Sequence, residues 1–569
     1  MIMACSALNA FAAPGDLDTD FATGGKFQTP VGGTYGSSVG GMIVQSDGRI
    51  FIGGEAWNDA TNNYDFALVR LTADGELDTT YDTDGEAMFP IGLKNDNGYS
   101  MALSPTDNSF VIVGAAGNAT FTKSDFAIAR FNSDGTLDTD FDTDGKATAY
   151  VEYDSRNDAS DAVIQSDGKI LVAGSAYLGY SPRIGVVRFL ANGSLDPDFD
   201  ADGRLLINPG NESFGNAVKV QESDGKIVIA GSYYNGNNGD FLIARYDSTG
   251  APDTTFGGDG IVTTPINNWD RAQDLVLQSD GKIIAVGSSS NGSNDDFTLV
   301  RYNTDGTLDT TFGGDGIVTT DFGSYDSAYA VMIDEDGKIV VTGSANNSTD
   351  SDFAVARYLS DGSLDTSFGS DGKVMTPVGN GYDSADDMAI QDDGKILLAG
   401  EIQTSGPSEF GIVRYIGKPE VVVEEPTRKA DVRLGTSATL ATGNNVYNLT
   451  GKGQAQPVKI TSGKTRTVQV GIQNDGTAAD TFKVKGTAGN KNFAITYLNG
   501  TRDVTASVVA GKFTTSSLDP GELVTLKAKI KAKTTKGGKD TGFSILATSN
   551  AKTTVQDKAI IKATSKAKK

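Results

Sequence analysis

The chain has 569 residues, which is too long for one ordinary hydrophobic core, so several domains or a repeat array are expected. Glycine is abundant at 70 residues and proline is scarce at 15, a balance typical of many tight turns and not of a disordered tract. Histidine is absent and Cys5 is the only cysteine, which excludes Ser-His-Asp and Cys-His catalysis, imidazole metal ligands and any disulfide within the chain.

Charge is distributed unevenly along the sequence. The net charge is −25, yet the part from residue 427 onward carries 24 Lys and Arg against 8 Asp and Glu. The preceding part carries 24 Lys and Arg against 65 Asp and Glu. A body this acidic repels nucleic acid and anionic lipid. We therefore expect no nucleic-acid partner.

The first 13 residues, MIMACSALNAFAA, are small and apolar and end in Ala10-Phe11-Ala12, the small-x-small pattern that precedes a signal-peptidase cut. We expect residues 1–13 to be an export signal, truncated relative to one that starts upstream, because the apolar run is short and lacks a basic segment before it. The alternative is a lipoprotein signal centred on Cys5. No later stretch reaches the ~18 apolar residues of a membrane-spanning helix. The predicted location is secreted or cell-surface.

Three short motifs recur in fixed order seven times between residues 14 and 416. The first motif is Leu-Asp-Thr-x-Phe, as at Leu364 to Phe368, and the second is Asp-Gly-Lys-Ile, as at Asp336 to Ile339. The third motif is an alternating run that ends in arginine and an aromatic residue. Its seven arginines are Arg70, Arg130, Arg188, Arg245, Arg301, Arg357 and Arg414, which lie 56 to 60 residues apart. We expect each to pair with the aspartate of a first motif.

Each repeat unit carries four strand signals and no apolar period of 3.6 residues. Asp336-Gly337 in the sixth unit is a dipeptide suited to a type I′ hairpin turn. The strands expected in that unit are Ser327–Ile333, Lys338–Thr342, Asp352–Tyr358 and Lys373–Thr376. Four-stranded units of this length are those of propeller blades. The sequence therefore predicts an all-β fold with a seven-bladed β-propeller over residues 14–416.

The phase of the repeat favours a closed ring over an open stack. The array begins with the fourth strand of a unit, at Gly25 to Thr29, and ends with a third strand at Arg414-Tyr415. Pairing these two strands would remove both exposed edges. We expect the N-terminal strand to complete the last blade. An open β-solenoid, the alternative, would need capping sequence at both ends.

With these motifs, the seven units resemble the delta-60 repeat family of bacterial exported proteins. The resemblance extends over about 400 residues, from Asp16 to Tyr415, and all seven copies keep the order of the motifs. It implies a bacterial cell-surface or secreted setting. It implies no established catalytic residues.

The repeat stops after residue 416, and residues 417–429 are expected to form a semi-extended linker. Alternating runs without the motifs return over residues 430–564, and seven to nine short strands there favour an immunoglobulin-like β-sandwich, followed by a basic tail over residues 565–569. Two of its turns, near Asn474 and Leu518, resemble those of bacterial surface immunoglobulin-like domains. Four lysines alternate with apolar residues and should lie on the solvent face of an edge strand: Lys527, Lys529, Lys531 and Lys533.

Two copies of the first motif run into alternating aspartates that end in glycine. This pattern matches the opening of a Ca²⁺-binding loop, in which hard oxygen ligands converge. The predicted Ca²⁺ ligands are Asp140, Asp142, Asp144, Asp198, Asp200 and Asp202. The twelfth positions hold Val151 and Pro209, which excludes the EF-hand form. The alternative is that these aspartates belong to ordinary Asp-Gly turns, and no other cofactor is predicted.

These observations favour a non-catalytic binding or adhesion protein that uses the propeller as an interaction platform. The expected partner is a protein or glycan at the cell envelope, and the protein itself is expected to be monomeric. Trp57 and Trp269 are predicted on loops, where a tryptophan can stack on a sugar ring. One alternative is an extracellular hydrolase or lyase with carboxylates in the propeller funnel. The sequence reveals no cluster that breaks the repeat symmetry, as an active site would. The other alternative is a structural matrix component.

Overall fold

The computed structural model describes residues 12–117, 123–347, 349–419, 430–435, 454–533, 538–539, 542–552 and 554–566. The expected export signal therefore lies almost entirely outside the described residues, as do most of the expected linker and basic tail. The chain divides into two compact units, residues 1–420 and 421–569. Among the described residues, no helix is long and apolar enough to cross a membrane.

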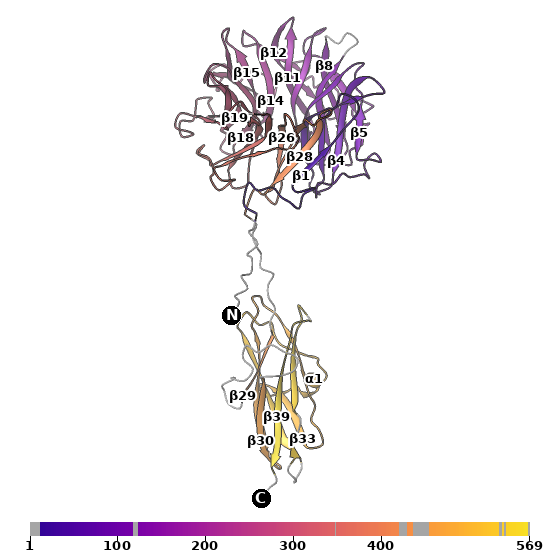
Figure 1. The fold of residues 1–569 in the computed structure, drawn as a ribbon, viewed down its shortest axis with the longest axis vertical. Coiled ribbons are helices and arrows are strands. Elements are labelled where there is room, and N and C mark those ends of the chain that lie inside the picture. The colour runs from indigo at the N-terminus through magenta and orange to yellow at the C-terminus, as the bar shows by residue number, and fades with distance from the viewer. Residues whose placement is uncertain are drawn as a thin grey trace. The chain divides into compact units, whose positions relative to one another are not determined.

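The first unit contains seven four-stranded antiparallel sheets arranged as blades around a centre (Figure 1). In each blade, the first strand is the innermost and the fourth is the outermost. Blade one has β2 (Ser37–Val44), β3 (Ile50–Asn58), β4 (Asn63–Leu71) and β5 (Glu86–Phe89). Blade two has β6 (Asp96–Leu103), β7 (Phe110–Gly117), β8 (Ser124–Phe131) and β9 (Lys146–Ala149). Blade three has β10 (Asn157–Ile164), β11 (Ile170–Leu178), β12 (Ser181–Phe189) and β13 (Arg204–Ile207).

The remaining four blades follow the same plan. Blade four has β14 (Ser213–Val220), β15 (Ile227–Tyr234), β16 (Gly239–Tyr246) and β17 (Ile261–Thr264). Blade five has β18 (Asp270–Leu277), β19 (Ile283–Ser290), β20 (Asp295–Tyr302) and β21 (Ile317–Thr320). Blade six has β22 (Asp326–Ile333), β23 (Ile339–Asn346), β24 (Ser351–Tyr358) and β25 (Lys373–Thr376). Blade seven has β26 (Ser384–Ile390), β27 (Ile396–Ile402), β28 (Glu409–Tyr415) and β1 (Lys26–Thr29).

The N-terminal strand closes the ring, which confirms the prediction from the phase of the repeat. β1 pairs antiparallel with β28, with Lys26 opposite Val413 and Thr29 opposite Phe410. The indigo N-terminal strand lies beside the orange C-terminal strand of the propeller in Figure 1. β1 is thus the fourth strand of blade seven and covers the edge of β28, as the fourth strand does for the third in every other blade.

In blades three to seven, the three sequence motifs meet at one place. In blade six, the carboxylate of Asp365 accepts from Arg357 Nε and from Lys338 Nζ, each at 2.8 Å. Burial favours the neutral acid, but hydrogen bonds from Lys338 and Ser367 and the charge of Arg357 hold the pKa of Asp365 well below its ordinary value. The guanidinium of Arg357 also lies 4.6 Å from the ring centroid of Phe368.

The predicted pairing of the seven arginines is confirmed throughout the ring. The Nε-to-Oδ2 distances lie between 2.7 and 3.2 Å for Arg70–Asp78, Arg130–Asp138, Arg188–Asp196, Arg245–Asp253, Arg301–Asp309, Arg357–Asp365 and Arg414–Asp18. The same guanidinium reaches the next blade: Arg301 donates to the carbonyl of Ser360 at 2.5 Å, and Arg414 donates to that of Ala73 at 2.9 Å. The ion pair therefore joins blades as well as stabilising each one.

The hairpin turn of blade six differs from the expected type I′. Type I′ requires positive φ at both central residues, but only Gly337, at 76°, has a positive φ. The Asp334 N–H donates to the Lys338 carbonyl, and the Gly337 N–H donates to the Asp334 carbonyl. This is a type I turn followed by a left-handed glycine. The Asp334 side chain favours it by accepting hydrogen bonds from the N–H groups of Asp336 and Lys338.

The second unit consists of two sheets over a shared hydrophobic core. One sheet has the order β29 (Ala430–Gly435), β31 (Thr465–Asn474), β36 (Leu523–Ala532), β33 (Phe493–Asn499) and β34 (Arg502–Asp503). The other has the order β30 (Ala455–Thr461), β39 (Gln556–Lys566), β38 (Phe543–Ser549), β32 (Phe482–Gly486) and β35 (Phe513–Thr514), with β37 (Gly538–Lys539) paired to β39. A short helix, α1 (Thr505–Val509), was not predicted.

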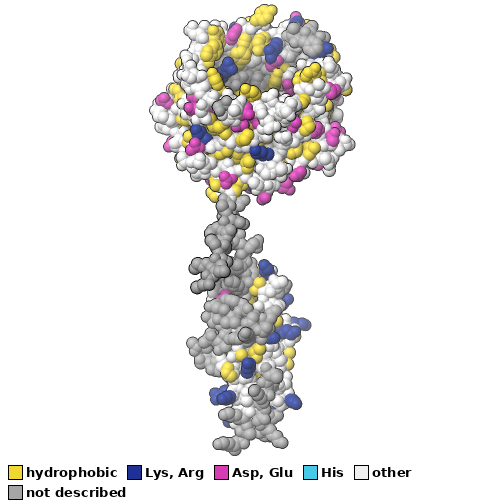
Figure 2. All heavy atoms as spheres, in the orientation of Figure 1, with side chains coloured by type: hydrophobic (Ala, Val, Ile, Leu, Met, Phe, Trp, Pro, Cys, Tyr) yellow, Lys and Arg dark blue, Asp and Glu magenta, His cyan; other side chains and the backbone are white. Residues whose placement is uncertain are grey.

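The lysines of β36 lie on the solvent face, as expected from their alternation with the buried Leu526, Ala528 and Ile530. Their expected position at an edge is wrong, because β36 pairs with β31 on one side and β33 on the other. Figure 2 shows Lys and Arg on the described surface of this unit and Asp and Glu spread over the propeller. The charge asymmetry of the sequence is thus also a difference between the two units.

Deleting residues 1–33 should destabilise the propeller strongly. The deletion unpairs β28 and removes Asp18, the partner of the buried Arg414. We expect a lower melting temperature, measured by circular dichroism, and aggregation through the exposed edge of β28. Truncation after residue 420 is the control and should leave the melting of the propeller unchanged. Equal melting temperatures for the two truncations would contradict closure by β1.

Among the seven arginine–aspartate pairs, replacing a buried member should lower the free energy of unfolding more than replacing a partly exposed one. The Arg357 and Asp365 side chains are 2% and 7% exposed, whereas those of Arg130 and Asp138 are 16% and 19% exposed. Asp365→Asn should lower the free energy of unfolding by about 3–5 kcal/mol because it leaves a buried guanidinium uncompensated. Asp138→Asn should cost about 1 kcal/mol. Denaturant unfolding measures both, and similar losses would argue against this assignment.

Candidate functional site

The innermost strand of every blade carries a β-bulge at the same place. The bulged residues are Gly40, Tyr99, Ser160, Asn216, Gln273, Tyr329 and Asp386. A glycine in the second strand of each blade makes room for the bulge. A Cβ on Gly343, for example, would lie 1.9 Å from the Ser327 carbonyl oxygen. Because a bulge re-aims side chains, it determines which residues face the centre of the ring.

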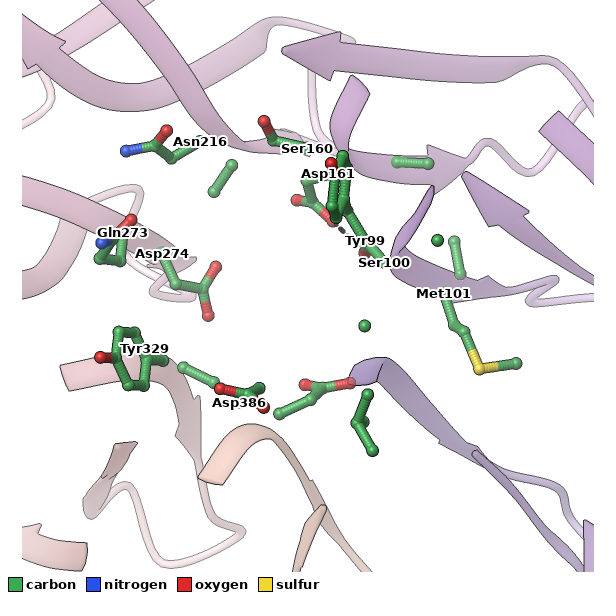
Figure 3. Close-up of a pocket in the computed structure, with 18 of the residues that line it drawn as sticks. Tyr99, Ser100, Met101, Ser160, Asp161, Asn216, Gln273, Asp274, Tyr329 and Asp386 are labelled. Carbon is green, nitrogen blue, oxygen red and sulfur yellow. Dashed lines mark hydrogen bonds between the residues drawn. The ribbon is translucent and has the colours of Figure 1, made fainter. Parts of the chain in front are cut away.

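The bulges line a central cavity of about 620 Å³. Side chains of Asp161, Asp274 and Asp386 extend toward the same open space from three different blades (Figure 3). The amides of Asn216 and Gln273 and the hydroxyls of Ser160 and Tyr329, among others, complete the lining. The cavity is therefore polar, and it contains one amine, that of Lys219, among several carboxylates.

Aspartate occupies the position after the bulge in blades three, five and seven. Asp161 Oδ2 accepts from the backbone N–H of Val218 at 2.9 Å, in the following blade. The same contact joins Asp274 to Val331 at 2.9 Å and Asp387 to Met42 at 2.7 Å. The residues at this position in the intervening blades are small: Gly41, Ser100, Ala217 and Ala330. These three aspartates thus hold neighbouring inner strands together across the ring.

Lys219 lies among these aspartates. Its Nζ is 3.0 Å from Asp161 Oδ2 and 3.7 Å from Asp274 Oδ1. Burial disfavours the ammonium form, but the charges of Asp161 and Asp274 outweigh burial and raise the pKa of Lys219. Burial likewise raises the pKa of Asp274, although Lys219 opposes this shift. The lysine side chain is about a third exposed, so it can still meet a ligand in the cavity.

A second group of acids gathers where blade seven meets blade one. It consists of Asp386, Asp387 and Glu401 from blade seven and Glu55 from blade one. Burial raises the pKa of Asp386 and of Asp387 to about 7 each. Burial also raises the pKa of Glu55 to about 7, with the charge of Glu401 adding to the shift. These carboxyl groups can therefore either donate or accept a proton near neutral pH.

This group corrects the conclusion that no cluster breaks the repeat symmetry. Glu55 and Glu401 follow the second-strand glycine, where the other five blades have alanine or serine: Ala115, Ser175, Ser232, Ser288 and Ser344. They are far apart in the sequence, and closure of the ring makes their blades neighbours. The replacement of serine by glutamate in the first and last units was the signal that could have identified the group.

An aromatic cleft of about 350 Å³ adjoins the cavity between blades four and five. Trp269, which is 47% exposed, stacks on Tyr234 with ring centroids 5.7 Å apart and an interplanar angle of 12°. Asn216 and Gln273 line both the cleft and the cavity, so the two spaces are neighbours that share part of their lining. Gly239 also lines the cleft, and a Cβ there would be in ordinary van der Waals contact with the Trp269 ring, at 3.4 Å.

Trp57 has a different environment, and its predicted position on a loop is wrong, because it lies in β3 and pairs with Tyr64 of β4. Its ring packs edge-on against Tyr35 and Tyr64, with centroids at 4.6 and 5.2 Å. Its indole N–H donates to Asp59 at 2.9 Å. Its polar atom and ring are thus engaged by neighbouring residues, and Trp269 is the tryptophan with an open neighbourhood.

The six aspartates predicted to bind Ca²⁺ lie exposed on two separate turns. Asp142 and Asp200 have φ values of 43° and 44°, and Asp144 and Asp202 accept hydrogen bonds from the backbone two residues ahead. Among the described residues, the only three acidic side chains with oxygens within 4.8 Å of one another are Asp296, Asp321 and Asp326. The structure therefore gathers neither predicted triad, and Ca²⁺ binding at these turns stays a prediction.

A family model described as "Domain of unknown function (DUF5122) beta-propeller" matches residues 45–81, 106–141, 165–199, 222–256, 278–312, 335–368 and 391–415. The chain carries seven DUF5122 β-propeller repeats. The last match ends at the third motif, because the first motif of blade seven lies at the N-terminus, in the stretch that β1 follows. The delta-60 name and the bacterial setting stay predictions.

The following similar solved structures have low sequence identity to this chain and low TM-scores. They include the β-propeller domain of the Trilobed protease from Pyrococcus furiosus, at 10% identity, with 69% of this chain and 95% of that chain covered and a TM-score of 0.35. The α-L-arabinofuranosidase Arb93A from Fusarium graminearum has 11% identity, 69% and 98% coverage and a TM-score of 0.38. Drosophila Semaphorin 2a has 7% identity, 98% and 100% coverage and a TM-score of 0.40. Such values support no statement about function. No curated protein matches the sequence.

The acids of the cavity should make stability depend on pH. A carboxyl whose folded pKa is about 7, against about 4 when unfolded, stabilises the fold below pH 4 and loses this contribution as the pH rises through 7. Asp386→Asn mimics the protonated acid, so it should raise the melting temperature at pH 8 and change it little at pH 5. Asp142→Asn, on an exposed turn, is the control. An equal effect of Asp386→Asn at both pH values would contradict the raised pKa.

Proposed function

We propose that the protein is a non-catalytic binding protein, secreted or at the cell surface, that holds a glycan at the aromatic cleft and the central cavity. The observation that carries the proposal is the position of the Trp269–Tyr234 stack beside a polar cavity, with Asn216 and Gln273 lining both spaces. An exposed aromatic face stacks on the C–H face of a sugar, while amides donate hydrogen bonds to its hydroxyls and carboxylates accept hydrogen bonds from them. Both kinds of group are present in these two neighbouring spaces.

The charge of the cavity limits the class of glycan. Its lining holds one amine, Lys219, against six carboxyl groups: Glu55, Asp161, Asp274, Asp386, Asp387 and Glu401. Such a concentration of acids repels sulfated, phosphorylated or uronic sugars. Neutral sugars, or sugars that carry free amines, fit the cavity. The acidic composition of the whole propeller acts in the same direction.

A glycan array probed with the intact protein tests this proposal. We expect binding to neutral or amino-sugar oligosaccharides and none to acidic ones. Trp269→Ala should weaken binding by up to about tenfold, since stacking contributes about 0.5–1.5 kcal/mol beyond area burial. Trp57→Ala is the matched control and should bind normally. Binding only to basic peptides, or equal loss in both variants, would argue against a glycan site at the cleft.

A hydrolase is the second candidate, and the acids between blades seven and one favour it. Glycosidases use two carboxyl groups whose environments separate their pKa values. Burial raises the pKa of Asp386 and of Glu55 to about 7, which suits a general acid, and Glu401 lies beside both. Release of reducing sugar from a bound oligosaccharide, lost in Glu401→Gln while binding persists, would favour this candidate. Binding without turnover in the wild-type protein favours the first.

A further inference from the structure

Three aspartates converge at the boundary between blades five and six, away from the central cavity. One carboxylate oxygen from each aspartate lies within 4.8 Å of one oxygen from each of the other two. Asp296 belongs to β20 and is 8% exposed, and Asp326 begins β22 and is 1% exposed. Asp321 follows β21 and is exposed, so it closes the group on the solvent side. Two of the three acids are thus buried, and the third leaves the group open to water.

The fold holds one oxygen of each buried aspartate and leaves the other without a partner. Asp296 Oδ2 accepts from Asn291 Nδ2 at 2.9 Å, and Asp326 Oδ2 accepts from the Phe322 N–H at 2.6 Å. Among the described residues, Oδ1 of each is buried without a hydrogen-bond partner. A buried acceptor in this condition costs free energy unless something outside the protein chain satisfies it.

Other blade boundaries show how this one differs. An aspartate also begins the inner strand at Asp96 and Asp270 and directly precedes it at Asp383. In these three aspartates both carboxylate oxygens accept hydrogen bonds from protein groups. At those three boundaries, the residue in the place of Asp321 is a proline: Pro90, Pro265 and Pro377. Only between blades five and six does the described structure combine a third carboxylate with unpartnered buried oxygens.

The carboxylates have no cationic side chain to neutralise them. Among the described residues, no Lys or Arg nitrogen forms an ion pair with any of the three. Lys373 is nearby, but its Nζ donates to the backbone carbonyl of Asp321 at 2.9 Å and lies over the ring of Phe322. Three like charges in a partly buried place repel one another strongly. A bound cation would remove this repulsion and supply the missing partners for the two Oδ1 atoms.

We propose that Asp296, Asp321 and Asp326 form a binding site for one divalent cation, Ca²⁺. Two oxygens that share a Ca²⁺ ion at 2.3–2.6 Å can be about 5 Å apart at most, which accommodates the 4.8 Å limit of this group. All donors are hard oxygens, and the exposed side of Asp321 leaves room for water ligands. Such a mixed and irregular set suits Ca²⁺ better than Mg²⁺, which requires a near-ideal octahedron. The site is independent of the proposed glycan binding.

The experiment uses the full chain, freed of metal by a chelator and titrated with CaCl₂ in a calorimeter. We expect one Ca²⁺ to bind per chain and the melting temperature to rise with Ca²⁺ and fall again with chelator, since a ligand stabilises the state that binds it. Asp321→Pro introduces the residue found at four other boundaries, so this variant should fold normally. Its Ca²⁺ affinity should fall at least about tenfold.

Two controls separate this site from the other acidic groups. Asp142→Asn and Asp200→Asn alter the two turns predicted to bind Ca²⁺ and should leave the titration unchanged. No heat of binding in the wild-type protein, or undiminished affinity in Asp321→Pro, would overturn the proposal. Loss of binding in the turn variants but not in Asp321→Pro would also overturn it and would place the ion on the turns. Tighter binding of Mg²⁺ than of Ca²⁺ would overturn the choice of ion.

Discussion

The whole propeller depends on the buried aspartate of the first motif. In blade six, Asp365 accepts from the arginine of the third motif and the lysine of the second, so one carboxylate joins three separate segments of the blade. The arginine cannot be left unpaired in so buried a position. Its remaining donors reach a carbonyl of the next blade, as Arg301 does with Ser360. The same contact therefore sets both the form of a blade and its spacing from the neighbour.

The bulge in each inner strand is what converts this scaffold into a site. A second-strand glycine such as Gly343 allows the bulge, and the bulge turns the following side chains toward the centre. The motifs are repeated because every blade needs them, whereas the central positions can differ from blade to blade without loss of the fold. Candidate functional residues accordingly lie where the repeat varies: Glu and Asp between blades seven and one, and Trp269 beside blade four.

Departures from the repeat also occur away from the centre. Asp321 stands where four other boundaries have proline, and it completes the only group of three converging carboxylates in the described residues. At this position Asp321 lacks the fixed φ that a proline gives to the loop. Such departures are expected at functional places. In a repeat protein they can be found by comparing each unit with the others.

The sequence by itself determined the architecture of the propeller: seven units, four strands in each, the arginine–aspartate pairs and closure by the strand before Val31. These features could be predicted because they depend on short contiguous motifs, on local periodicity and on the phase of the repeat. The tertiary structure alone decided the turn type at Gly337, the interior position of β36 and the meeting of Glu55 with Asp386. The reason is that neighbours across a closed ring are distant in the chain. Their convergence and the burial that raises their pKa values exist only once β1 has paired with β28.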